Sequence, residues 1–129
     1  NNLLLYMLFF FLITFLILDS IYLTLTKNYY NNLVTKIQKS PLELKIMPAV
    51  GAYSIILFSW YYFVFQNIKN QSKKKSIIDS AVLGFCMYCL FDFTNMAIFK
   101  NWDLKTVIID SIWGSILYTL TTIIYLISI

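Results

Sequence analysis

The chain has 129 residues, of which 60% are hydrophobic and only 12% are charged, and its mean hydropathy is +0.72. Soluble domains carry about a quarter of charged residues, so this composition excludes a water-soluble globular protein and indicates an integral membrane protein. The formal net charge is +4, but the chain has no His, and its ten cationic residues are all lysines spread over the connections between apolar segments, which excludes nucleic-acid binding.

Four apolar segments follow one another along the chain. They cover about residues 3–25, 46–65, 77–99 and 104–129. Each supplies the roughly 20 residues that a helix needs to cross a hydrocarbon layer of about 30 Å. We therefore predict an all-α fold: one integral membrane domain over residues 1–129, built as a four-helix transmembrane bundle in contact with the lipid bilayer.

The connection after the first segment has its own pattern. Between Lys27 and Lys39, apolar side chains recur at helical spacing, at Tyr30, Leu33 and Ile37, with polar residues between them. This pattern is typical of a short amphipathic helix that lies at a membrane surface. We predict such an interfacial helix between the first and second spans.

Helix starts can also be predicted from capping patterns. Residues 40–43 read Ser-Pro-Leu-Glu, a capping box with proline at the first helical position, so the second helix is expected to begin at Pro41. Pro48 would then lie inside that helix and kink it. Ser76 and Asp79 form a similar signature for the third helix, and Asp103 is expected to cap the fourth.

The lysines give a prediction of orientation. With four spans, both termini share one side of the membrane with the loop 67–76, which holds Lys69 and the cluster Lys73–Lys75. The other side holds six lysines in longer connections. Positive charge accumulates on the cytoplasmic side. We place the termini there, because Lys73–Lys75 is the densest cluster, although the raw count of six against four favours the opposite orientation.

The most informative residues are three acids inside the spans. Asp19, Asp92 and Asp110 lie six or seven residues from the span ends that reach one common surface. At about 1.5 Å per residue, all three carboxylates are expected roughly 10 Å below that surface. A carboxylate facing lipid costs about 2.5–3.5 kcal/mol or more, so we expect all three to point into the bundle.

Each acid has polar or aromatic neighbours on its own helical face. Residues spaced by three, four or seven positions share one stripe of a helix. We therefore predict an acidic pocket, or ion- or substrate-binding site, that opens to one surface. Its members are Asp19, Tyr22, Tyr88, Asp92, Asn95, Asp110 and Trp113. The three aspartates are also the candidate ligands for a metal ion; the pattern identifies no catalytic residue and no cofactor.

Two motifs resemble those of a known family. Residues 91–95 read Phe-Asp-Phe-Thr-Asn, which resembles a Tyr-Asp-x-Thr-Asn signature, and residues 110–114 read Asp-Ser-Ile-Trp-Gly, which resembles Asp-x-x-Trp-Gly. Both signatures belong to small predicted membrane proteins catalogued as domain of unknown function 2177. Asp19 and the pair Tyr29-Tyr30 also fall where that family has an Asp and an aromatic residue.

The resemblance covers nearly the whole chain and implies a four-span protein without supplying an activity. It marks as motif positions Asp92, Thr94, Asn95, Asp110, Trp113 and Gly114. The chain departs from the signature at Phe91, where the family usually has Tyr, so one hydroxyl is missing from the motif.

Three classes of function remain. The first is handling of protons, cations or a small solute at the acidic pocket, by a homo-oligomer or by a subunit of a larger membrane complex, since clustered carboxylates without Arg or Lys nearby need a neutralising partner. The first alternative is an intramembrane enzyme that acts on a lipid or isoprenoid. The second is a structural or accessory subunit in which the acids only tie helices together, through bonds worth about 0.6 kcal/mol each.

Overall fold

A computed structural model describes residues 2–129, and in this range the chain is helical with no strand. The elements are α1 (Asn2–Leu25), α2 (Lys27–Gln38), α3 (Ile46–Phe63), the 3-10 helix η1 (Phe65–Asn70), α4 (Lys73–Ile98) and α5 (Leu104–Ser128). Four of them, α1, α3 with η1, α4 and α5, are long and apolar enough to cross a membrane. The predicted all-α bundle of four membrane-spanning helices is confirmed.

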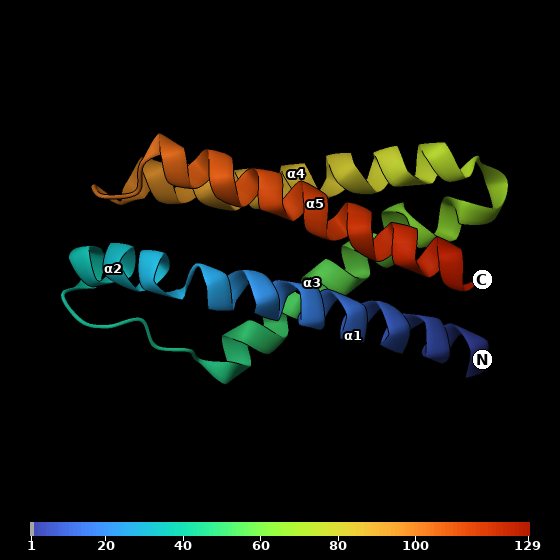
Figure 1. Ribbon diagram of the computed structural model, residues 1–129, viewed down its shortest axis with the longest axis horizontal. Helices are drawn as coiled ribbons and strands as arrows, with labels where there is room; N and C mark the ends of the chain where they lie inside the picture. The colour runs from blue at the N-terminus through green and yellow to red at the C-terminus, as the bar shows by residue number, and fades with distance from the viewer. Residues whose placement is uncertain (1) are drawn as a thin grey trace.

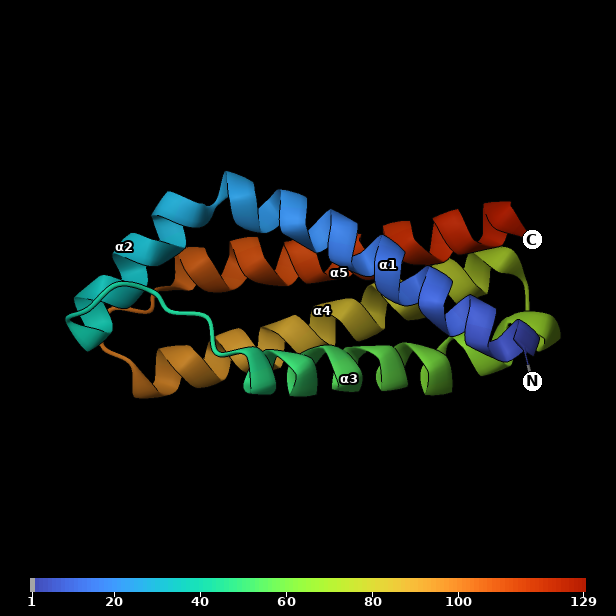
Figure 2. The same ribbon diagram turned by 90° about the horizontal axis from the view of Figure 1, so that it is seen from below.

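The four long helices alternate in direction (Figure 1). Helix α5 packs most extensively against α4 and also contacts α1, while α3 contacts both α1 and α4, so the helices close into a ring. Figures 1 and 2 place both termini at one end together with the connection from α3 to α4. We call this the terminal end, and we call the opposite end, where α2 and the turn between α4 and α5 lie, the α2 end.

Helix α2 confirms the predicted short helix between the first two spans. It follows α1 after one residue, Thr26, and ends at Lys39 in the left-handed conformation, with φ of 64°. Its one buried residue, Leu33, packs with Trp102 of the turn before α5 and with Val107 in the first turn of α5. The helix therefore closes the α2 end of the bundle rather than lying free of it.

Two of the predicted helix starts are wrong. Helix α3 begins at Ile46 and not at Pro41, because side chains of α2 hold the polar backbone groups of the preceding loop. Gln38 donates to the carbonyl oxygens of Ser40 and Pro41, and Asn31 accepts from the N–H of Leu42. Pro48 then falls in the first turn of α3, where a missing N–H removes no bond within the helix, so the predicted reason for a kink disappears.

Helix α4, in contrast to α3, starts earlier than predicted. It begins at Lys73, and Ser72 caps it by accepting a hydrogen bond from the N–H of Lys75 at 3.1 Å. The predicted cap at Ser76 is therefore wrong, because an equivalent hydroxyl lies four residues earlier. The predicted cap of α5 is confirmed: Asp103 accepts from the backbone N–H of Thr106 at 2.9 Å and from its hydroxyl at 2.7 Å.

Two glycines allow α4 and α5 to approach closely. A Cβ at Gly84 would overlap the carbonyl oxygen of Gly114, and a Cβ at Gly114 would overlap the ring of Tyr88. Small residues at helix contacts are a general device of membrane proteins, in which close packing replaces the hydrophobic driving force. The two glycines thus set the spacing of the helix pair that carries Asp92 and Asp110.

An aromatic core fills the bundle between the α2 end and the terminal end. Its fully buried members are Phe11, Phe15, Trp60, Val64, Leu117, Tyr118 and Tyr125. The polar groups in this layer are paired, with Trp60 donating to the Thr122 hydroxyl at 3.0 Å and the hydroxyls of Ser59 and Tyr118 lying 2.9 Å apart. Large apolar side chains on the outer faces, such as Ile17, Val82 and Ile112, are exposed and suited to lipid contact.

Candidate functional site

Asp19 connects three helices near the α2 end. Its carboxylate is buried on α1 and accepts a hydrogen bond from the Tyr53 hydroxyl of α3 at 2.5 Å. Its other oxygen accepts from the indole N–H of Trp113 on α5 at 3.3 Å. Both oxygens of Asp19 therefore have partners within the protein.

Asp110, on α5, is held by two tyrosines. One of its oxygens accepts from the Tyr22 hydroxyl of α1 at 3.1 Å and from the Tyr30 hydroxyl of α2 at 3.2 Å. The two hydroxyl oxygens also lie 2.7 Å apart. This arrangement joins α1, α2 and α5 around one carboxylate and fixes its orientation.

Asp92, on α4, differs from the other two acids. Its side chain is completely buried, and neither carboxylate oxygen has a hydrogen-bond partner. The carboxyl of Asp110 and the indole of Trp102 lie beside it, yet the Trp102 N–H is also buried without a partner. Within residues 2–129 the one ion pair joins Lys75 to Asp79, so no lysine neutralises Asp92. A buried polar group left in this state is costly, which makes Asp92 a candidate to hold a ligand.

A stacked pair of rings links Asp19 with Asp110, and Asp92 joins this network as the neighbour of Asp110. The rings of Tyr22 and Trp113 lie parallel, with centroids 4.6 Å apart and an interplanar angle of 4°. Each acid lies six residues from the helix end that faces the α2 end: Asp19 from Leu25, Asp92 from Ile98 and Asp110 from Leu104. At about 1.5 Å per residue they share a depth of roughly 9 Å. We call Asp19, Tyr22, Tyr30, Tyr53, Asp92, Asp110 and Trp113 the acidic network.

Two of the residues named from the sequence lie outside the acidic network. Tyr88 packs its ring over Gly114 and against the aromatic core, and Asn95 is half-buried; neither bonds to Asp92, which has no partner. Both lie on the same face of α4 as Asp92, but the ring of Tyr88 packs against Gly114 of α5 instead of bonding to Asp92. At the position where the family motif has a hydroxyl, Phe91 instead packs edge-on against Trp102, with centroids 6.3 Å apart.

The network also contains residues that the sequence reasoning missed. The sequence patterns place Tyr30 only on the apolar stripe of α2 and in the family resemblance, and they give no role to Tyr53 or to Trp102, which lies beside Asp92 but outside the defined network. For Tyr30 a signal existed, since the Tyr29-Tyr30 pair lies at an aromatic position of the family resemblance. Tyr53 carries no motif or spacing signal, because its role depends on how α3 crosses α1.

The carboxylates are arranged in a pair and a separate acid rather than in a compact trio. In the described range 2–129, no group of three or more Cys, Asp or Glu side chains is placed to hold a metal ion together. Asp92 and Asp110 are neighbours, whereas Asp19 is turned toward Tyr53 and Trp113. The site therefore consists of two adjacent carboxyls, and the two oxygens of one of them, Asp92, are free to accept hydrogen bonds or bind a ligand.

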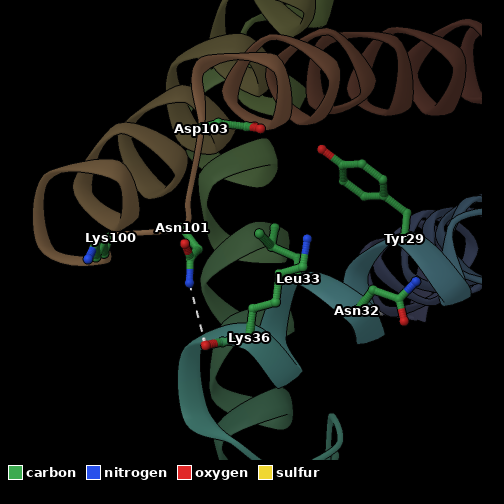
Figure 3. A pocket seen from close by; sticks show the side chains of 7 residues that line it. All are labelled: Tyr29, Asn32, Leu33, Lys36, Lys100, Asn101 and Asp103. Atoms are coloured by element: carbon green, nitrogen blue, oxygen red, sulfur yellow. Dashed lines mark hydrogen bonds between the residues drawn. The ribbon is translucent and has the colours of Figure 1, made fainter.

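Two hollows lie near the acidic network, and only the first is lined by one of its residues. A groove of about 340 Å³ lies between α1 and α3, is lined mostly by aliphatic side chains such as Leu12, Leu16 and Leu57, and includes Tyr53 in its wall. A cavity of about 520 Å³ lies between α2 and the turn from α4 to α5 (Figure 3). The first is apolar and the second carries charged and amide side chains, so they suit different ligands.

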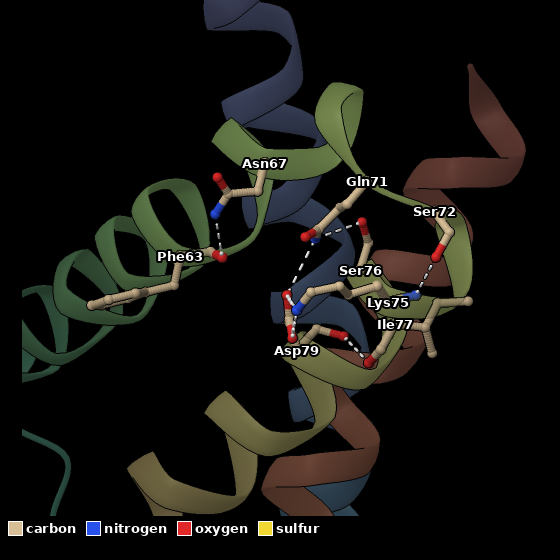
Figure 4. A network of polar contacts seen from close by, with 9 residues as sticks. Phe63, Asn67, Gln71, Ser72, Lys75, Ser76, Ile77 and Asp79 are labelled. Carbon is tan, nitrogen blue, oxygen red and sulfur yellow. Dashed lines mark hydrogen bonds and ion pairs between the residues drawn. The ribbon is translucent and has the colours of Figure 1, made fainter.

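The fourth acid of the long helices, Asp79, belongs to the terminal end. It forms an ion pair with Lys75 at 3.2 Å and accepts from the amide of Gln71, which also contacts Ser76 (Figure 4). The predicted capping role of Asp79 is wrong, because α4 starts at Lys73 with Ser72 as its cap, so Asp79 lies inside the helix. These bonds instead tie the end of η1 to the first turns of α4.

The family model described as "Predicted membrane protein (DUF2177)" matches residues 3–127. No curated protein matches the chain, and no solved structure matches it.

Proposed function

The chain belongs to the family of predicted membrane proteins DUF2177, and we propose that it binds a proton or a small cation at the Asp92–Asp110 pair, near one membrane surface. One observation carries the proposal: Asp92 is fully buried beside a second carboxyl, no cation pairs with it, and the nearby Trp102 N–H does not reach it in good hydrogen-bond geometry. Two adjacent buried carboxyls cannot both stay charged without compensation. A shared proton or a bound cation supplies that compensation.

The surroundings of the pair support different roles for Asp110 and Asp92. Asp110 already receives two tyrosine hydroxyls, so it is the oriented member. Asp92 is the open acceptor, and the unpartnered Trp102 N–H beside it offers a donor to a water or a second ligand atom. Asp19 has both oxygens occupied, and we assign it to holding α1, α3 and α5 together.

The proposal includes assembly into an oligomer or a larger membrane complex. Between the acidic network and the terminal end the interior is filled by the aromatic core, whose polar groups bond to one another. A route across the membrane therefore needs groups from another chain. Light scattering of the detergent-solubilised protein, with the mass of bound detergent subtracted, checks this: a protein mass of at least twice 15.2 kDa supports assembly, and a mass of one chain contradicts it.

The proposed orientation places the termini in the cytoplasm, so the acidic network lies toward the opposite surface. The density of Lys73–Lys75 at the terminal end supports it. With the native Cys86 and Cys89 replaced by alanine, single cysteines at Ser72 and Asn101 mark the two ends for an impermeant thiol reagent applied from outside. Labelling of Asn101→Cys but not Ser72→Cys supports the orientation, and the reverse pattern overturns it.

The α1–α3 groove favours a second candidate, an enzyme acting on a lipid or isoprenoid. Its aliphatic walls suit a hydrocarbon chain, and Tyr53 in its wall donates to Asp19, so a carboxylate lies directly behind the groove. General acid–base chemistry at a bound chain would use these two groups. Turnover of a lipid by the wild-type protein, abolished in Asp19→Asn, would favour the enzyme over the ion-binding proposal.

Infrared difference spectroscopy of the protein in lipid vesicles tests the first candidate. A protonated carboxyl has its own C=O stretch, and we expect one such band to titrate in the wild type and to disappear in Asp92→Asn. Asp79→Asn is the matched control, because it removes an acid that is paired with Lys75 at the other end. Loss of the band on adding Na⁺, K⁺ or Ca²⁺ at constant pH identifies a cation that displaces the proton.

Two results would overturn the proposal. One is a band that persists in Asp92→Asn and Asp110→Asn. The other is the absence of both a titrating band and any cation-dependent change in the wild type. Either outcome leaves the structural-subunit interpretation, in which the acids serve only helix packing.

A further inference from the structure

The larger cavity, at the α2 end, is separate from the acidic network. Figure 3 shows it between side chains of two walls. Tyr29, Asn32 and Lys36 come from α2, and Lys100, Asn101 and Asp103 come from the turn that precedes α5, with Leu33 between the walls. A volume of about 520 Å³ lies within the usual range for a small-molecule site.

Some polar groups of this cavity already have hydrogen-bond partners, and others do not. Asp103 uses one carboxylate oxygen to cap α5 through Thr106, and the Tyr29 hydroxyl contacts the Thr106 hydroxyl at 2.5 Å. Lys36 and Lys100, on opposite walls, have no ion pair in the described part of the chain. The lining thus combines two free ammonium groups with one carboxylate that already has partners.

Further contacts hold the walls in place and add positive charge. The amide of Asn101 donates to the carbonyl oxygen of Lys36 at 3.4 Å, which ties the turn to α2. The ammonium group of Lys105 lies 5.9 Å from the centre of the Tyr29 ring, next to the cavity. Two cations therefore line a space that has one acidic group, and a third cation lies beside one of its walls.

The position of the cavity selects the ligand. It lies at the end of the bundle, between α2, which follows the span α1 after one residue, and the turn that joins the spans α4 and α5. Lysines at this depth attract anionic lipid headgroups. We propose that the cavity binds the phosphate headgroup of an anionic phospholipid, with Lys36 and Lys100 as the two clamping cations.

Native mass spectrometry of the detergent-washed protein tests this proposal. After incubation with equal amounts of phosphatidylglycerol and phosphatidylcholine, we expect the wild type to retain one phosphatidylglycerol per chain. The double variant Lys36→Gln/Lys100→Gln should lower the apparent affinity about 25-fold, at roughly fivefold per lysine. The matched control Lys73→Gln/Lys74→Gln removes the same charge at the terminal end and should retain the lipid.

The outcomes separate the cavity from general surface attraction. Equal loss in both double variants means that lipid is held by net charge, and retention in Lys36→Gln/Lys100→Gln means that it binds elsewhere; both overturn the proposal. Displacement of the lipid by an equal concentration of inorganic phosphate would assign the cavity to free phosphate instead. If the double variant is less stable, Asn32→Asp, which keeps both lysines but adds a carboxylate to the same wall, should still reduce retention.

Discussion

The rings of Tyr22 and Trp113 stack in parallel, 4.6 Å apart, and each ring donates a hydrogen bond to a different aspartate. The Tyr22 hydroxyl bonds to Asp110, and the Trp113 indole bonds to Asp19. The stack therefore couples two acids that do not contact each other directly. It also joins α1 to α5 at the depth of the proposed ion site, so a change at one acid has a packed route to the other.

The first prediction separates the contribution of the hydrogen bonds made by Tyr22 and Trp113 from the contribution of the stacking of their rings. Trp113→Phe removes the donor to Asp19, whereas Tyr22→Phe removes one of two donors to Asp110. Each is expected to lower the free energy of unfolding by about 0.6–1.7 kcal/mol, because Phe keeps part of the packing. Denaturant titration in mixed micelles measures this. A loss above about 3 kcal/mol in Tyr22→Phe would contradict the view that Tyr30 still satisfies Asp110.

How much the sequence could predict depends on the range of the interaction. The four spans, the helix at residues 27–38 and the cap at Asp103 follow from local composition and spacing, and the structure has them. The common depth of Asp19, Asp92 and Asp110 follows from counting residues along helices. These features need no knowledge of which helices are neighbours.

The partners of the acids could not be predicted in the same way. Tyr53 reaches Asp19 only because α3 lies beside α1, and Tyr88 turns from Asp92 to Gly114 because α4 and α5 approach so closely. The prediction that α3 starts at Pro41 is wrong for a related reason. The side chains of Gln38 and Asn31, which belong to α2, form hydrogen bonds with backbone groups of the loop that precedes α3. Tertiary contacts decide these points, and local patterns do not contain them.

The second prediction concerns the α4–α5 contact. Gly114→Ala places a methyl group inside the Tyr88 ring and forces the helices apart, at an expected cost of about 1–3 kcal/mol of unfolding free energy. Gly51→Ala is the matched control, because a Cβ there meets nothing within 4 Å and alanine favours a helix. Thermal unfolding in detergent compares them. Equal stability of the two variants would show that the close contact is absent.

The third prediction is a pH dependence at the start of α5. The hydroxyl and the N–H of Thr106 hold the pKa of Asp103 below its usual range. A lowered pKa in the folded state stabilises the helix start above the unfolded value of about 3.9, and this contribution is lost as the pH falls through the folded pKa. The protection of the amides of residues 104–107 against hydrogen exchange, relative to their intrinsic exchange rates at each pH, should therefore fall below about pH 4 in the wild type.

Substitution at the same residue provides the control for that pH effect. Asp103→Asn keeps a capping oxygen without a titrating proton, so the protection of these amides relative to their intrinsic rates should not change in the same pH window. Asp103→Ala should lose about 0.5–2 kcal/mol relative to the wild type at neutral pH, and the difference should shrink as the pH falls below about 4. If Asp103→Asn shows the same acid-dependent step as the wild type, another group is responsible for it.

The last prediction compares two acids at one depth. Asp92 is fully buried without a partner, so Asp92→Val removes an unsatisfied carboxyl and is expected to leave the protein as stable or up to about 3 kcal/mol more stable at neutral pH. Asp19→Val is the matched control, because it leaves the Tyr53 hydroxyl and the Trp113 N–H without their acceptor and should cost about 1–3 kcal/mol. Unfolding free energies in lipid–detergent micelles give the comparison. A protein that gains stability when Asp92 is lost keeps that residue for its function, as expected where a site is maintained at the expense of folding. A loss in Asp92→Val as large as that in Asp19→Val would instead mean that Asp92 has structural partners, and the case for an ion or proton site at Asp92 would fall.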